Sequence, residues 1–235
     1  MWVLLLLGSC TAERGGPDDS EPDTGISIPE QWEPLFGVVG DPDTNVGIAG
    51  VHVSDMARPT AAAVTDGDGR WTFDDDTTVP FLTLRFSGDT RVPLAAWIAP
   101  VEAASGAIGY ATRLGTLQSL VELLGAVGVE VEPGRALLFV DALDPTMRCI
   151  GGATVEISAE NAGAWREAAV GEWVPESLTN EDRHDLMFVN VAPGPLTLTV
   201  VAPDGSACEV PPGVTLVADE VAQVSVYCAY RVEPE

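Results

Sequence analysis

Three cysteines in the C-terminal part of the chain, Cys149, Cys208 and Cys228, are the residues whose chemistry the sequence constrains most. Two apolar runs within residues 214–227, separated by a short polar turn, predict a final hairpin. That hairpin would bring Cys228 close to Cys208, and a disulfide requires Cα atoms within roughly 7 Å of each other. We therefore predict a Cys208–Cys228 disulfide, while a pairing of Cys149 with either partner remains open. Such a bond indicates an oxidising compartment.

The chain offers little for catalysis or metal binding. Its 11 Lys and Arg residues are all arginine, which excludes Schiff-base lysine chemistry and a phosphate-loop lysine. The two histidines, His52 and His184, are far apart and have no cysteine at the spacing of a zinc site. Asp66 and Asp68, with acids at 74–76, suggest calcium, but an EF-hand alignment fails and a tight turn explains them better. We therefore predict no catalytic residue, no metal and no cofactor.

Composition favours many short strands and argues against nucleic acid as a partner. The chain has 235 residues, with 36 acidic and 11 basic side chains and a formal net charge of −25. Phosphate binding needs a basic surface that releases counterions, and so acidic a composition does not favour one. The 24 glycines and 18 prolines, together with 46% hydrophobic residues, are typical of a turn-rich globular chain.

The N-terminal residues resemble an export signal. The apolar run Met1–Leu7 is too short to span a bilayer core of about 30 Å. It leads into Leu7-Gly8-Ser9-Cys10, which resembles the lipobox of bacterial lipoproteins. The resemblance implies that a signal peptide of residues 1–9 is removed and that the Cys10 thiol is acylated. The protein would then be lipid-anchored to a membrane of the bacterial cell envelope and face outside the cytoplasm.

Residues 10–34 form an acidic segment that we predict to be a disordered tether. After Cys10 it contains seven acidic residues, one arginine and four prolines. Such a composition buries too little apolar surface to compensate for the entropy lost on ordering. An acidic interaction tail is the alternative, but a solvated spacer is the more common role of such a segment.

From residue 35 the chain alternates short apolar runs with turn residues, and Asp66-Gly67-Asp68-Gly69 predicts a hairpin between two strands. The stretches Ile48-Ala49-Gly50-Val51-His52-Val53 and Thr65-Asp66-Gly67-Asp68-Gly69-Arg70-Trp71-Thr72-Phe73 resemble the carboxypeptidase regulatory-like domain. The resemblance implies a transthyretin-like, or prealbumin-like, β-sandwich over residues 35–100. In that family these residues are structural, and the domain accompanies an enzyme or is repeated on a surface protein.

A second sandwich of similar type is predicted for residues 135–230, although the Thr-Asp-x-x-Gly turn is missing there. The linker of residues 101–134 contains an apolar stripe at helical spacing. The stripe consists of Leu114, Leu117, Leu120, Val121 and Leu124. It predicts one amphipathic helix within residues 111–127 that packs on one sandwich or between the two. A helix that binds a partner is the alternative.

Together these patterns predict an all-β fold of two antiparallel β-sandwich modules, prealbumin-like, joined by a segment containing one amphipathic helix. We interpret the chain as a non-catalytic, lipid-anchored cell-envelope protein whose modules act as spacers or bind an unknown protein or glycan. Two alternatives remain. Trp97, Trp165 and Trp173 would suit a carbohydrate-binding module if they formed a stacking face. The many carboxylates would suit a calcium-dependent or carboxylate-dependent glycan hydrolase.

Overall fold

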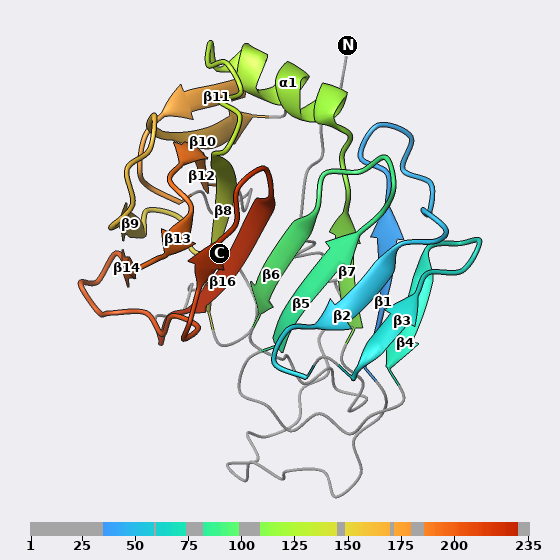
Figure 1. Cartoon of the computed structure of the whole chain (residues 1–235). Helices are drawn as coiled ribbons and strands as arrows, with labels where there is room; N and C mark the ends of the chain where they lie inside the picture. Colours follow the sequence, from blue (N-terminus) through green and yellow to red (C-terminus); the bar gives the residue numbers. More distant parts are fainter. Residues whose placement is uncertain are drawn as a thin grey trace, which may run out of the picture.

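The computed structural model describes residues 35–58, 60–73, 82–98, 109–144, 149–169, 172–179 and 186–229. The predicted signal peptide, Cys10, the tether, His184 and the acids at 74–76 therefore lie outside the described residues. The described parts consist mainly of β-strands with one α-helix, which confirms the predicted all-β fold class (Figure 1).

Nine strands form one large sheet that extends through the whole molecule (Figure 1). The strands are β2 His52–Asp55, β3 Ala62–Val64, β5 Leu82–Ser87, β6 Leu94–Ile98, β8 Ala136–Leu143, β10 Ala164–Ala169, β11 Glu172–Pro175, β12 Leu186–Val191 and β16 Val221–Tyr227. Their spatial order is β11-β10-β12-β8-β16-β6-β5-β2-β3. Every residue of β8 and β12 is buried, so both faces of the sheet are covered at its centre.

A three-stranded sheet covers one face of the large sheet in the N-terminal half, which we define as β1 to β7. It contains β1 (Leu35–Gly40), with β4 (Arg70–Phe73) antiparallel to it and β7 (Gly109–Arg113) parallel to it. Buried side chains of β1 and β4 pack against β2, β5 and β6. Strand β7 belongs to this sheet although it lies beyond the predicted module limit at residue 100.

The Asp-Gly turn at residues 66–69 does not close a hairpin. It joins β3 to β4, and these strands belong to different sheets. The hairpin prediction is therefore wrong, because the turn carries the chain from the large sheet across the sandwich to the small one. The alternation of the two strands still holds, since β4 buries Trp71 and Phe73 and exposes Arg70 and Thr72.

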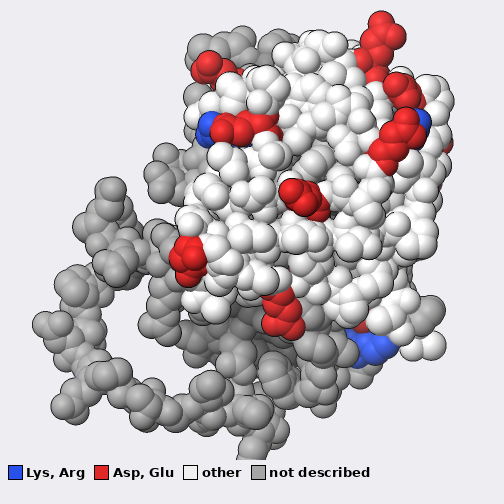
Figure 2. Space-filling view, turned by 90° about the vertical axis from the view of Figure 1, so that its left-hand side faces the viewer, with Lys and Arg blue, Asp and Glu red and all other residues white. Residues whose placement is uncertain are grey.

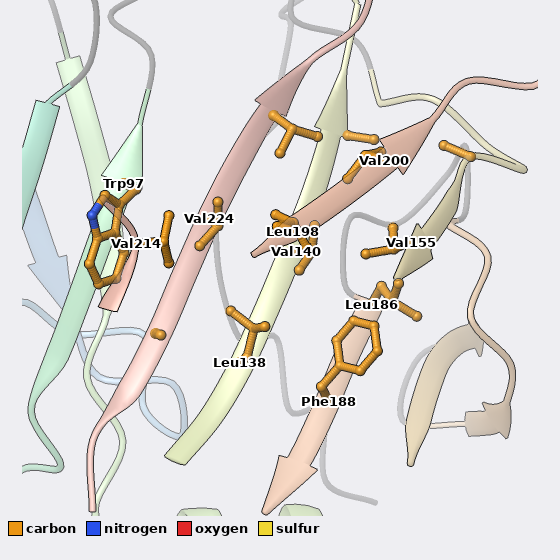
Figure 3. Close-up of a cluster of buried hydrophobic side chains, with 14 of the residues drawn as sticks. Trp97, Leu138, Val140, Val155, Leu186, Phe188, Leu198, Val200, Val214 and Val224 are labelled. Carbon is orange, nitrogen blue, oxygen red and sulfur yellow. The ribbon is translucent and has the colours of Figure 1, made fainter. Parts of the chain in front are cut away.

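The C-terminal half, β8 to β16, places two short two-stranded sheets on the opposite face of the large sheet. One pairs β9 (Thr154–Ile157) with β14 (Leu198–Val201), and the other pairs β13 (Gly194–Pro195) with β15 (Thr215–Leu216). Their apolar side chains meet those of β8, β12 and β16 in the cluster drawn in Figure 3. The large sheet is thus the middle of three layers.

Strand β16 joins the two halves. It pairs in parallel with β6 of the N-terminal half along one edge and with β8 of the C-terminal half along the other. The predicted final hairpin is wrong, because residues 215–216 pair with β13 instead of β16. Asp219 redirects the chain: its φ is 60°, and its carboxylate accepts a 2.7 Å hydrogen bond from Gly134 N–H beside the start of β8. Most other pairs are antiparallel, and the two sandwiches share one sheet.

The helix predicted within residues 111–127 is α1, Leu117–Ala126. It begins late because residues 109–113 are strand β7 and because Thr116 caps the helix. The Thr116 hydroxyl accepts a 3.1 Å hydrogen bond from Ser119 N–H, which satisfies one of the free amides of the first turn.

The packed face of α1 differs from the predicted one. Leu123 and Leu124 are buried against β8 and β12, but Leu117 and Val121 are 61% and 45% exposed. The prediction that these two residues belong to the packed stripe is therefore wrong. The helix is rotated so that Leu117 and Val121 face away from the sheet.

The two halves repeat the same local hydrogen bonds. Val51 N–H donates to the hydroxyl of Thr65 at 2.9 Å, and Ala153 N–H donates to that of Thr179 at 3.0 Å. The Thr65 hydroxyl in turn donates to Ile48 O at 2.6 Å, and that of Thr179 donates to Ile150 O. Both threonines are 4% exposed.

The glycine before each bonded amide has the same conformation, with φ 77° at Gly50 and 74° at Gly152. Ile48 N–H also donates to Val39 O, and Ile150 N–H donates to Ala142 O, both at 2.9 Å. Strand β1 therefore corresponds to β8, and counting back three residues matches Phe36 with Phe139. The chain contains one structural unit twice.

Candidate functional site

Cys208 and Cys228 form a disulfide, as predicted, with their Cα atoms 4.1 Å apart. The reason differs from the predicted hairpin. The neighbouring residues Glu209 and Tyr227 exchange two backbone hydrogen bonds, 2.5 and 3.0 Å long, which hold the two chain segments side by side. The disulfide therefore ties the segment after β14 to the end of β16, the strand that joins the halves.

Cys149 is buried and takes no part in that bond. It forms a β-bridge with Leu143, and Cys228 N–H donates to Leu143 O at 2.9 Å. Leu143 thus pairs with the segments that carry Cys149 and Cys228. Neither of the alternative pairings left open by the sequence is present.

The candidate metal ligands do not converge in the described parts of the chain. Asp66 Oδ1 accepts hydrogen bonds from the N–H groups of Asp68 and Arg70, both at 2.9 Å, which supports the turn interpretation. His52 lies exposed on β2. Within the described ranges, no three His, Cys, Asp or Glu residues are placed to hold a metal ion.

The tryptophans considered for sugar stacking do not form a common exposed face. Trp97 is 4% exposed and belongs to the cluster of Figure 3. Trp165 and Trp173 are half-buried and pack against the cluster beneath α1. Trp71 is buried between the two sheets of the N-terminal half.

A chain of hydrogen-bonded polar side chains, half-buried at Tyr110 and buried at Gln223 and Asp141, crosses the joint between the halves. Tyr110 Oη on β7 donates to Gln223 Oε1 at 2.8 Å, and Gln223 Nε2 donates to Asp141 Oδ2 at 2.8 Å. Burial raises the pKa of Tyr110 above its usual value, so the phenol stays protonated, and remains a donor, even in alkaline solution. The sequence analysis did not identify these residues. Gln223 is a single polar residue in an apolar strand, and nothing in the sequence around it indicates which distant side chains it contacts.

An ion pair spans the same joint. Arg85 Nη2 on β5 lies 3.1 Å from Glu220 Oε2, just before β16. The Glu220 side chain is 3% exposed, and its other carboxylate oxygen has no hydrogen-bond partner among the described residues. Burial raises the pKa of Glu220, and the positive charge of Arg85 offsets this only in part.

The surface is acidic, and α1 borders a groove. Figure 2 shows acidic side chains spread over the face formed by the C-terminal half, with few basic ones.

The groove beside α1 has an empty volume of about 410 Å³, and its apolar lining includes Leu117, Leu120, Leu124 and Val131. The described residues contain no helix that is long and apolar enough to cross a bilayer.

No protein-family model and no curated protein matches this chain. Among solved structures, a shaft pilin SpaA from Lactobacillus rhamnosus GG shares 12% identity over 86% of this chain and 100% of its own, with a TM-score of 0.25. The Bacillus anthracis TIE protein shares 13% over 83% of this chain and 33% of its own, also at 0.25. A streptococcal ancillary pilin shares 14% over 84% and 62%, at 0.24. At such TM-scores the overall arrangements differ, and the similarity does not establish a shared fold.

Proposed function

We propose that this protein is a non-catalytic, lipid-anchored component of a bacterial cell envelope that holds two carboxypeptidase regulatory-like sandwich modules outside the cytoplasm. In this proposal Cys10 carries the lipid, residues 10–34 form the tether, and the fused sandwiches act as a spacer or bind a protein or glycan. No nucleic acid partner is expected for so acidic a chain.

The observation that carries this proposal is the Cys208–Cys228 disulfide. Structural disulfides persist in oxidising compartments and are rare in the cytosol, so the bond favours a location outside it. The shared large sheet supports the spacer role, because β16 is hydrogen-bonded to a strand of each half and the disulfide fixes its end.

Mass spectrometry of the full chain expressed in a bacterium tests this proposal. We expect the mature protein to begin at Cys10, to carry acyl groups there, and to lack the two hydrogens lost on forming the disulfide. A Cys10→Ala variant should remain unprocessed and carry no acyl group, while a Cys149→Ala variant should be lipidated normally. A wild-type chain that is unmodified and cytosolic would refute the proposal.

A further inference from the structure

The repeated unit exposes in one half a surface that is covered in the other. The outer face of the β8 sheet carries Phe139, which is 1% exposed because α1 packs over it. The corresponding residue of the N-terminal half, Phe36, is 44% exposed on the outer face of β1, and Val38 beside it is 39% exposed. No element among the described residues covers them as α1 covers Phe139. The face of β8 around Phe139 binds a helix, and the face of β1 around Phe36 is its counterpart in the other half.

Charge distinguishes this face from the rest of the chain. The three strands of the small sheet contain two arginines, Arg70 and Arg113, and no acidic residue, in a chain of net charge −25. In the register of the sheet Arg70 lies opposite Val38, so it is on the outer face with Phe36. Arg113 lies opposite Gly40 at the end of this face, where its guanidinium donates a 3.0 Å hydrogen bond to Asn45 Oδ1. The apolar pair Phe36 and Val38 is flanked by positive charge. A complementary partner would present an apolar surface flanked by negative charge.

The same chain carries a surface of that kind on α1. Leu117 and Val121 face away from the sheet at 61% and 45% exposure, with Glu122 beside them. The helix contains no basic residue. The neighbouring groove is lined by Glu132 and by Arg135, whose guanidinium lies 3.5 Å from the Glu132 carboxylate, so Glu122 is the acidic residue that the helix itself offers. That groove is lined by Leu117 and other apolar residues and also by polar ones, among them Arg135 and Asn190.

We propose that the outer face of the small sheet of one copy binds the outer face of α1 of a second copy. Phe36 enters the groove beside Leu117, Val38 contacts Val121, and Arg70 lies near Glu122 of the helix. The two surfaces are different, so the contact is head-to-tail and leaves one free face of each kind on every dimer. Such contacts build closed rings or open chains.

Sedimentation velocity tests this inference. The full chain carries Cys10→Ser, which prevents acylation, and is measured over a wide range of protein concentration. We expect species larger than a dimer at high concentration, and weaker association at high salt because exposed charges are screened. Phe36→Ser and Leu117→Ser should each weaken association at least tenfold. Val64→Ser, at an equally exposed valine of the edge strand β3, is the matched control and should have no effect.

Mixing the two variants identifies the geometry. The Phe36→Ser chain retains its helix face and the Leu117→Ser chain retains its sheet face, so an equimolar mixture should form dimers and nothing larger. Val38→Ser with Val121→Ser repeats the test if either first variant misfolds. A wild-type chain that stays monomeric, a Leu117→Ser chain that still self-associates, or a mixture with no dimer would each overturn the proposal.

Discussion

Where β1 pairs with β4 in the N-terminal half, Gly37 lies opposite Trp71; at the corresponding position of the C-terminal half, Val140 lies opposite Leu186. One pair combines the smallest residue with the largest, and the other combines two of middle size. All three side chains are buried, at 3% or less. The same backbone arrangement is thus filled by different residues whose volumes compensate, which is how cores with little sequence similarity reach native density.

The halves differ more outside this shared frame. The C-terminal half inserts β10 and β11 between the segments that correspond to β2 and β4, extends the large sheet through them, and adds the disulfide. In the N-terminal half, residues 35–73, 82–98 and 109–113, as far as the structure describes them, contain neither addition, and none of them covers the outer sheet face as α1 covers its counterpart. The shared frame therefore accounts for the fold, and the additions decide which surfaces remain open.

Gly37→Ala should lower the stability of the protein more than any other change proposed here. It tests directly whether the small residue at position 37 makes room for Trp71. A Cβ there would lie 2.1 Å from the carbonyl oxygen of Tyr110 and 2.6 Å from the ring of Trp71, and the backbone oxygen cannot move freely. We expect the free energy of unfolding to fall by more than about 3 kcal/mol, measured by denaturant titration. Gly40→Ala, on the same strand with no atom nearer than 3.9 Å, is the control. Equal costs at both glycines would contradict the interpretation.

Removing the disulfide should have the next largest effect and act on the C-terminal half. The bond closes a loop with a sequence separation of 20, and the chain-entropy model assigns such a loop about 3 kcal/mol. We expect the double variant Cys208→Ala/Cys228→Ala to lose that amount in a denaturant titration. Reductant should destabilise the wild type by a similar amount and leave the variant unchanged; an equal response of both proteins would count against this assignment.

Thr65→Val and Thr179→Val test whether the repeated hydrogen bonds are energetically equivalent. Each change leaves one buried amide without its acceptor, at Val51 or Ala153, and should cost about 2 kcal/mol. Because the two threonines lie in different halves, the double variant should lose the sum. The conservative variants Thr65→Ser and Thr179→Ser keep the hydroxyl and should recover most of the stability. If only one of the two variants lost much stability, the two hydrogen bonds would have the same geometry but different energies.

Local patterns predicted part of the strands of this protein, but residues 111–113 of β7 fell within the predicted helix, and β6, β10 and β11 were not predicted. The span Arg70–Phe73 is a strand as expected, and the positions of β1, β8 and β12 follow from apolar runs bounded by turn residues. The disulfide was also predicted, although the predicted hairpin was wrong and the proximity comes from the bridge between Glu209 and Tyr227. Short-range signals give strand positions because alternation and turn chemistry are local properties.

Strand partners were harder to predict, since they depend on contacts far apart in the chain. The turn at residues 66–69 has the composition of a hairpin, yet the flanking strands pair with β2 and β1. The threonine of the second unit was missed because Thr179 lacks the Asp-x-x-Gly that follows Thr65. The likeness of Ile150-Gly151-Gly152-Ala153 to Ile48-Ala49-Gly50-Val51 could have indicated the start of the second unit. It could not have indicated the threonine, because Thr65 follows Ile48 by 17 residues and Thr179 follows Ile150 by 29.

Glu220→Gln should give the smallest effect, and its sign depends on pH. The pKa of Glu220 is raised in the folded protein, so the stabilising contribution of the protonated form is complete below the unfolded pKa and is lost as pH rises through the folded one. Glutamine does not titrate, so the variant should gain stability relative to wild type from about pH 4 to pH 7.

The gain should be on the order of 0.5 kcal/mol, because the variant also loses the pair with Arg85, whose side chain is 43% exposed. Thermal unfolding at a series of pH values measures the difference. Glu132→Gln, at a glutamate whose side chain is 58% exposed, is the control and should not show this trend. A Glu220→Gln protein that is less stable than wild type at neutral pH would mean that the ion pair outweighs burial. The joint between the halves would then be held by charge as well as by the strands of the shared sheet.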